Sequence, residues 1–136
     1  MTVHACLSRR HVLGGAVAFG ACGPLLVACG ADEDPPAEVP DAGTQLAGTS
    51  EVPVGGGVIL KNQNVVLTQP TKGEFKAFEA TCTHAGCTVT SVSTTITCSC
   101  HGSQFELADG SVTHGPATAA LPAVKITVDG TSILTA

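Results

Sequence analysis

Two short boxes of cysteine and histidine hold the residue types that bind transition metals. Residues 82–87 read C-T-H-A-G-C, and residues 98–103 read C-S-C-H-G-S. Each box places a Cys close to a His and contains one further Cys. Thiolate and imidazole groups suit iron, zinc and copper. A short strand pair, about residues 89–97, would join the boxes, so that two adjacent loops face one another and hold a small inorganic core.

The residue types alone leave two other interpretations open. Two Cys and two His can bind a structural zinc ion, although zinc knuckles favour wider His spacing and have no use for the two further cysteines. In an oxidising compartment the four cysteines can instead form two disulfides. That arrangement leaves unexplained why a His stands at a matching place in each box. Either alternative would make the chain a non-redox binding module.

The double box resembles that of Rieske iron–sulfur proteins, in the form C-x-H-x-G-C and C-x-C-H-G-S, and the resemblance covers most of residues 75–136. It implies one 2Fe–2S cluster per chain, with two thiolates on one iron and two imidazoles on the other. The implied ligands are Cys82, Cys98, His84 and His101. Two ferric ions, two sulfides and two thiolates sum to zero charge, so this set accepts an electron at a higher potential than four thiolates would.

The resemblance also implies roles for residues around the cluster. Cys87 and Cys100 match a disulfide that braces the two loops in the high-potential, respiratory branch of the family, and Ser103 matches a serine whose hydroxyl donates to a cluster sulfur. Residues 114–117, H-G-P-A, resemble a loop that covers the cluster on its third side. Phe105 stands where the highest-potential members have Tyr. Since a phenyl ring cannot donate, we expect a potential lower by roughly tens of millivolts.

The elements that must position these boxes are short strands. From residue 51 onward, short apolar runs alternate with turn-forming residues, and no long segment has the helical period. The pattern predicts strands at residues 58–60, 65–67, 75–78, 94–97, 105–107, 124–128 and 133–134. Strands this short and this closely spaced predict an all-β fold. With the resemblance, we expect a Rieske-type antiparallel β-sandwich with a small cluster-binding subdomain.

The first 29 residues predict an export signal. Arg9 and Arg10 precede an uncharged run rich in Gly and Ala, which resembles a twin-arginine signal for proteins exported in the folded state. The run ends in L-V-A-C-G, which resembles a lipoprotein processing box, so we expect a lipid on Cys29. An uncleaved transmembrane helix is the alternative. Residues 30–50, rich in Pro and acidic residues, predict a solvated tether, which leaves residues 51–136 as the domain, at the periplasmic or outer face of a membrane.

The charge composition excludes nucleic acid as a partner. The net charge is −5 and both arginines lie in the predicted signal, so the chain has no basic surface for nucleic acid. We expect an electron-transfer component rather than an enzyme acting alone, with a cytochrome, a quinol complex or a molybdenum oxidoreductase subunit as redox partner. Three settings are open: the Rieske subunit of a cytochrome bc-type quinol oxidoreductase, the small subunit of an arsenite-oxidase-like enzyme, and a free-standing lipid-tethered carrier. The absence of a Tyr at position 105 and the predicted tether favour the small oxidoreductase subunit and the free-standing carrier over the quinol oxidoreductase subunit.

Overall fold

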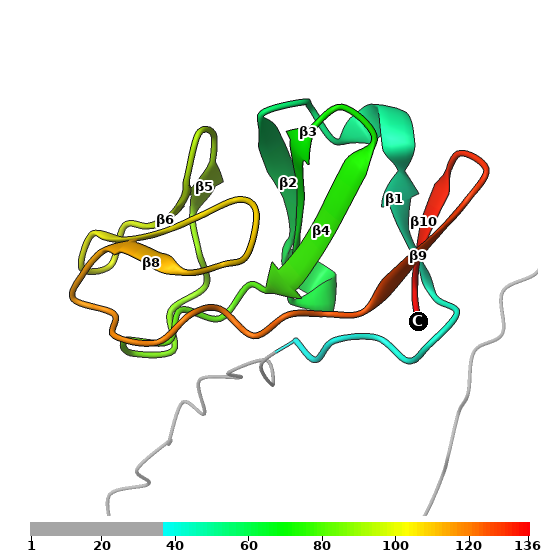
Figure 1. Ribbon diagram of the computed structural model, residues 1–136. Helices are drawn as coiled ribbons and strands as arrows, with labels where there is room; N and C mark the ends of the chain where they lie inside the picture. The colour runs from blue at the N-terminus through cyan, green and yellow to red at the C-terminus, as the bar shows by residue number, and fades with distance from the viewer. Residues whose placement is uncertain (1–36) are drawn as a thin grey trace, which may run out of the picture. The chain divides into compact units, whose positions relative to one another are not determined.

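The computed structural model describes residues 37–136, which form ten short strands and two 3-10 helices (Figure 1). The strands are β1 (Gln45–Gly48), β2 (Gly56–Leu60), β3 (Val65–Thr71), β4 (Glu74–Glu79), β5 (Ser91–Val92), β6 (Ile96–Cys98), β7 (Ser103–Phe105), β8 (Val112–His114), β9 (Ile126–Asp129) and β10 (Ser132–Thr135). The 3-10 helices are η1 (Thr49–Glu51) and η2 (Lys61–Gln63). The predicted export signal and Cys29 lie outside the described residues. Among those that are described, no helix is long and apolar enough to cross a membrane.

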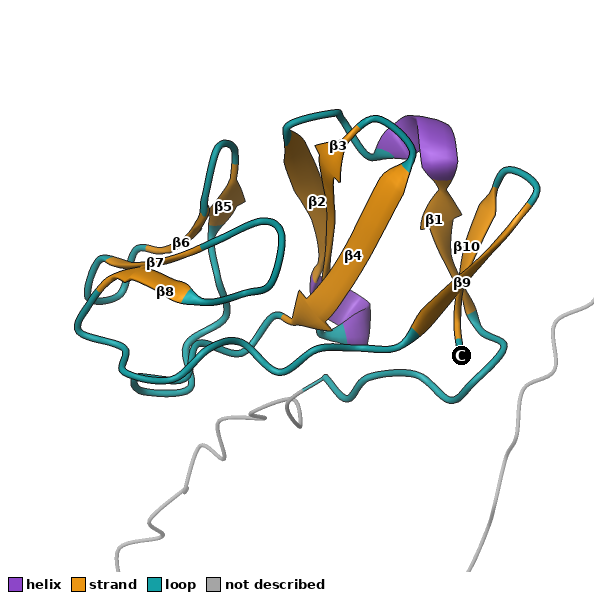
Figure 2. Ribbon diagram, in the orientation of Figure 1, coloured by secondary structure: helices purple, strands orange, loops and turns teal. Residues whose placement is uncertain are grey.

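The strands of this region form three antiparallel sheets (Figure 2). Two three-stranded sheets, ordered β1-β10-β9 and β2-β3-β4, make up the base. The third sheet, ordered β5-β6-β7-β8, belongs to the smaller subdomain. The second Cys/His box connects β6 to β7, and the first lies between β4 and β5, flanked by an isolated bridge between Thr81 and Thr88. Its strands have only two or three residues, so backbone pairing contributes little there and the loops need other support. The predicted all-β fold with a small cluster-binding subdomain is confirmed.

The N-terminal boundary of the domain lies earlier than predicted. β1 falls within residues 30–50, the predicted tether, and pairs with β10 at Gln45–Leu134 and Gly48–Ser132. Leu46 and Ala47 are buried in the base. The sequence around β1 is short and rich in Gly and Thr, so it has no strand pattern of its own. Pairing with the C-terminal strand, which is distant in sequence, is what makes it a strand.

Two predicted strands in the small subdomain are shifted. The strand expected at residues 94–97 begins only at Ile96, because Ser93 N–H donates to the Thr95 carbonyl and closes the β5–β6 hairpin. The strand expected at residues 105–107 is β7, which starts at Ser103, the last residue of the second box. Both shifts follow from the tight turn and the box loop, which set the register more strongly than β-branched composition does.

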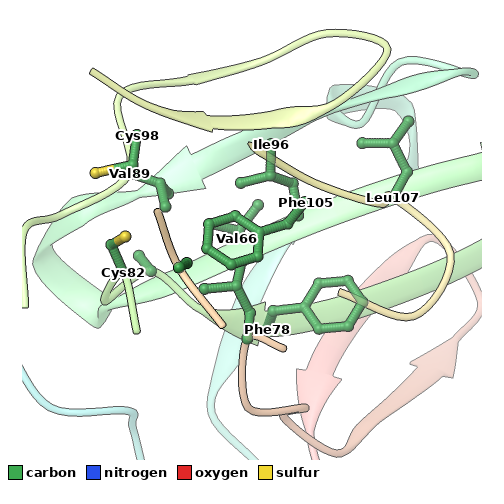
Figure 3. Close-up of a cluster of buried hydrophobic side chains, with 11 residues drawn as sticks. Val66, Phe78, Cys82, Val89, Ile96, Cys98, Phe105 and Leu107 are labelled. Carbon is green, nitrogen blue, oxygen red and sulfur yellow. The ribbon is translucent and has the colours of Figure 1, made fainter. Parts of the chain in front are cut away.

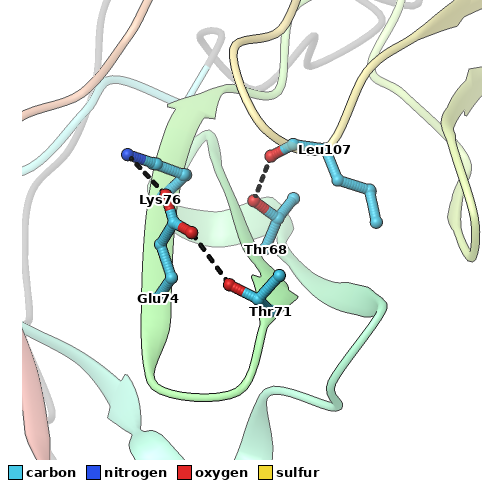
Figure 4. A network of polar contacts seen from close by, with 5 residues as sticks. All are labelled: Thr68, Thr71, Glu74, Lys76 and Leu107. Carbon is cyan, nitrogen blue, oxygen red and sulfur yellow. Dashed lines mark hydrogen bonds and ion pairs between the residues drawn. The ribbon is translucent and has the colours of Figure 1, made fainter.

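Two apolar cores hold the domain together. The first joins the small subdomain to the base and contains Val66 and Phe78 from the base together with Ile96 and Phe105 from the subdomain (Figure 3). The second lies within the base. A buried hydrogen bond, in which Thr68 Oγ1 of β3 donates to the Leu107 carbonyl at 2.7 Å, also ties the loop after β7 to the base (Figure 4). The small subdomain is therefore fixed on the base by apolar packing as well as by its two connecting chains.

Candidate metal centre

The two boxes fold into loops of the same shape. In loop 1 (residues 82–87) the Gly86 N–H donates to the Cys82 carbonyl at 2.9 Å, and in loop 2 (residues 98–102) the Gly102 N–H donates to the Cys98 carbonyl at 2.9 Å. Each loop thus closes over five residues and ends in a glycine of positive φ, 75° at Gly86 and 87° at Gly102. Only glycine adopts this conformation without strain. This shape, which the two loops share, directs the first Cys and the His of each box toward the opposite loop.

A disulfide joins the two loops. Cys87 and Cys100 are bonded, with their Cα atoms 6.6 Å apart, so the predicted pairing is confirmed. The sulfurs of Cys87, Cys98 and Cys100 all lie within 4.8 Å of one another. The brace therefore lies directly beside the thiol of Cys98.

The other two cysteines of the boxes are free thiols in the interior. Cys82 is 3% exposed and Cys98 is 1% exposed. Burial raises the pKa of the Cys98 thiol, and the neighbouring Cys82 thiol raises that pKa further. The N–H groups of Cys100 and His101 oppose these effects by donating to the sulfur. Two adjacent buried thiols can both ionise only if a cation neutralises them, so this pair fits a metal centre better than an apolar core.

The two histidines of the boxes lie at the surface, on opposite loops. The ring centroids of His84 and His101 are 4.8 Å apart, and the ring planes meet at 81°. Both side chains are exposed. The structure thus shows the four predicted ligands as two pairs, the neighbouring buried thiols of Cys82 and Cys98 and the exposed imidazoles of His84 and His101. This polarity gives a redox centre one shielded side and one side that a partner can reach.

A third loop, residues 114–120, contacts both boxes. The Ala117 N–H donates to the Ser103 Oγ at 3.0 Å, and the Thr83 Oγ1 donates to the Ala119 carbonyl at 2.6 Å. Because the Ser103 oxygen accepts from Ala117, its own proton is free to donate elsewhere. The third loop is therefore fixed against both boxes, and the covering role expected for residues 114–117 stays a prediction. Thr83 and Ala117 were not predicted as site residues, since no spacing in the sequence signals a contact between them and their distant partners.

Phe105 lies in the first core, to which the two free thiols also belong. Its ring is fully buried, and Cys82 and Cys98 belong to the same cluster of side chains (Figure 3). A phenyl ring brings packing but no hydrogen-bond donor. The thiol side of the site is therefore dry, and the backbone N–H groups of Cys100 and His101 are the donors seen at the Cys98 sulfur.

Comparison with known proteins agrees with the geometry. The family model of the Rieske [2Fe-2S] domain matches residues 44–125. The chain is 41% identical over 68 residues to the cytochrome bc1 complex Rieske iron–sulfur subunit of Corynebacterium diphtheriae, covering 47% of this chain and 17% of that protein. It is 37% identical over 79 residues to the cytochrome b6-f complex iron–sulfur subunit of Prochlorococcus marinus subsp. pastoris, covering 55% and 44%. The chain thus spans less than half the length of these relatives.

Among solved structures, the ferredoxin of carbazole 1,9a-dioxygenase from Nocardioides aromaticivorans IC177 has the same fold, with a TM-score of 0.57 at 22% identity over 68% of this chain and 95% of that one. The chain belongs to the Rieske [2Fe-2S] family and is a disulfide-containing member of it. Its cofactor is a 2Fe–2S cluster, and the donor set of two buried thiols and two exposed imidazoles fits that group.

Proposed function

We propose that this chain is an exported, membrane-tethered one-electron carrier in a respiratory or periplasmic redox chain. Its cluster is held by the thiolates of Cys82 and Cys98 and the imidazoles of His84 and His101. The observation that carries the proposal is the pairing of two buried free thiols with two exposed, mutually close histidines from facing loops. When bound, the cluster supplies the uptake and release of a single electron.

The residues of the chain determine how the electron enters and leaves. Cys82 and Cys98 lie in the apolar core, so water and partners do not reach the site from that side. His84 and His101 offer exposed ring edges as the shortest path to a partner. Each imidazole also has a second ring nitrogen that can hold or release a proton to solvent, which allows electron transfer to be coupled to protonation.

A disulfide and two hydrogen bonds keep the ligand loops in place. The Cys87–Cys100 disulfide prevents loops 1 and 2 from separating. The third loop is held to loop 1 by Thr83 and to the start of β7 by Ser103. A fixed geometry lowers the structural change that accompanies each change of oxidation state, which is what an electron carrier requires.

The setting is a proposal drawn from three features. The relatives are named as subunits of cytochrome bc1 and cytochrome b6-f complexes, which supports a redox protein as partner. The buried Phe105 has no donor for a ligand sulfur, which favours a carrier or a small oxidoreductase subunit over the quinol-oxidising subunit. The pattern of the first 29 residues supports export by a twin-arginine route and anchoring through a lipid on Cys29, with an uncleaved helix as the other form of anchor.

The test is to isolate the protein after export with its own signal and to measure iron, acid-labile sulfide and the low-temperature EPR spectrum after reduction. We expect two iron atoms per chain and the low average g value of a histidine-ligated 2Fe–2S cluster. A His84→Ala variant should lose the cluster, whereas His114→Ala, a change at an exposed histidine of β8, should keep it. Colourless wild-type protein without iron would refute the proposal.

Anchoring needs a separate measurement. Mass spectrometry of the mature N-terminus should show a lipid on Cys29, and Cys29→Ser should move the protein from the membrane fraction to the soluble fraction if the lipid is the anchor. An unprocessed N-terminus on a membrane-bound protein would favour the uncleaved helix instead.

A further inference from the structure

A threonine outside the two boxes holds the backbone on both sides of Cys98. Thr90 lies between loop 1 and β5, next to the end of the β5–β6 ladder, where Ser91 is opposite Thr97. Its N–H donates at 2.8 Å to the carbonyl of Thr97, the residue before Cys98. Its Oγ1 accepts at 3.1 Å from the N–H of Ser99, the residue after Cys98. One residue thus fixes both of the peptide groups that flank the Cys98 Cα atom.

The hydroxyl of Thr90 makes further contacts with the same two neighbours of Cys98. Its Oγ1 lies 2.6 Å from the Ser99 Oγ and donates at 3.1 Å to the Thr97 carbonyl. A hydroxyl has one proton and two lone pairs. The Thr90 hydroxyl can therefore accept the Ser99 N–H while it also bonds the Ser99 hydroxyl or the Thr97 carbonyl. We call these hydrogen bonds of Thr90 with Thr97 and Ser99 the Thr90 clamp.

The two peptide groups that flank Cys98 determine where its sulfur lies. The orientation of these planar groups about a Cα atom is what its φ and ψ angles describe. The same stretch of backbone also carries the N–H groups of Cys100 and His101, which donate to the Cys98 sulfur. The Ser99 carbonyl and the Cys100 N–H belong to one planar peptide group. A Ser99 that is held in place therefore also limits the direction of the first of these donors.

Loop 1 positions its cysteine in another way. The Cys82 N–H donates to the Cys87 carbonyl at 2.7 Å, so this loop is closed by its own two cysteines. Loop 2 is held at two neighbouring positions by the segment that follows loop 1. Cys87 bonds Cys100 through the disulfide, and Thr90 bonds Ser99 through the clamp. The disulfide thus ties the loops together, while the clamp fixes the backbone next to the buried thiol.

We propose that Thr90 is a positioning residue for the cluster ligand Cys98 and that it acts through the backbone of Thr97 and Ser99. The inference rests on the proposed function, because it takes Cys98 as a ligand. Hydrogen bonds around a metal ligand fix its geometry and tune the metal. A backbone that is free to turn at Cys98 would weaken the N–H bonds to its sulfur, which stabilise the reduced, more negative state. The clamp therefore supports both retention of the cluster and a higher reduction potential.

The clamp lies at the surface, so its role at Cys98 can be separated from the folding of the domain. Thr90 and Ser99 are both exposed, and water can bond the Ser99 N–H when the threonine hydroxyl is removed. An exposed hydrogen bond that water can replace contributes little to folding. We therefore expect Thr90→Val, which keeps the shape of the side chain, to fold with an unchanged far-UV circular dichroism spectrum and an intact disulfide.

The test measures the reduction potential and the rate of iron release to a chelator in the exported holoprotein. Thr90→Val should lower the potential and raise the rate of iron release by about twofold to tenfold, which corresponds to the loss of one hydrogen bond of ordinary strength. Thr90→Ser keeps the hydroxyl and should restore both quantities to the wild-type values. Thr94→Val is the matched control and should change neither quantity. It makes the same chemical change at an exposed threonine of the β5–β6 turn, whose hydroxyl has no hydrogen bond among residues 37–136.

A Ser99→Ala variant tests the route through Ser99. It removes the Ser99 hydroxyl but keeps the N–H that Thr90 accepts, so its effect on both quantities should be smaller than that of Thr90→Val. Combined with Thr90→Val, it should add no further change, because the hydroxyl that it would have bonded is already absent.

Three kinds of result would overturn the inference while leaving the proposed function intact. A wild-type potential and a wild-type rate of iron release in Thr90→Val would show that the clamp does not position Cys98. Equal impairment in Thr90→Ser or in Thr94→Val would assign the effect to the hairpin rather than to the Thr90 hydroxyl. Additive effects of Thr90→Val and Ser99→Ala would exclude the route through Ser99. Wild-type protein that contains no iron and no acid-labile sulfide would instead refute the proposed function itself.

Discussion

The Cys87–Cys100 disulfide should supply a large part of the stability of the small subdomain. The two residues are 13 positions apart, and closing a loop of that size in the unfolded chain is worth about 3 kcal/mol in the chain-entropy model. The total free energy of unfolding of a small domain is about 5–15 kcal/mol. The four strands of the small subdomain have only two or three residues each, so pairing between them offers little to replace the disulfide.

The perturbation that tests this estimate is the double variant Cys87→Ser, Cys100→Ser. A single variant would leave a free thiol, because Cys87, Cys98 and Cys100 have their sulfurs within 4.8 Å of one another, and that thiol could compete for the metal or exchange with Cys98. The double variant removes this ambiguity and replaces each sulfur by a smaller hydroxyl.

The measurements are urea unfolding of the double variant and the rate of iron release below the unfolding transition. We expect a loss of about 3 kcal/mol in the free energy of unfolding, a cluster that is released faster, and a lower reduction potential. Wild-type protein whose disulfide has been reduced chemically is the control and should behave like the variant. If the double variant kept the wild-type unfolding free energy, cluster lifetime and potential, the brace would have no structural role and this reasoning would be wrong.

Three other substitutions test the surroundings of the cluster. Ser103→Ala leaves the buried Ala117 N–H without its acceptor, which should lower the free energy of unfolding in urea by about 1–3 kcal/mol. The variant also removes a hydroxyl donor, which should lower the reduction potential in a redox titration. An unchanged potential would show that Ser103 does not donate to the cluster. Phe105→Tyr adds a donor at the thiol side and should raise the potential by roughly tens of millivolts, whereas a fall would mean that the hydroxyl disrupts the core. Gly57→Ala places a methyl group against the Leu67 carbonyl of the neighbouring strand. It should lower the melting temperature, by about 4–8 °C for each kcal/mol of unfolding free energy that is lost. An unchanged melting temperature would show that β2 can shift without cost.

The sequence alone was sufficient for the chemistry of the site. The spacing within residues 82–87 and 98–103 places one Cys and one His in each closed loop, because five residues closed by a left-handed glycine have few other conformations. The alternation of short apolar runs with turns was likewise sufficient for the all-β fold, since both signals are local. The disulfide between Cys87 and Cys100 followed from the resemblance, and the structure confirms it.

Other features of the molecule depend on contacts between residues that are far apart in the chain. β1 is a strand because it pairs with β10, and its own residues carry no signal that could have moved the domain boundary to its true place. Thr83 and Ser103 hold the third loop through hydrogen bonds to Ala119 and Ala117, and the sequence does not reveal which hydroxyl meets which distant backbone group. Local spacing determines which Cys and His residues lie in the two loops. The fold as a whole determines which of these side chains are buried and which a partner can reach, because burial depends on every segment that packs around them.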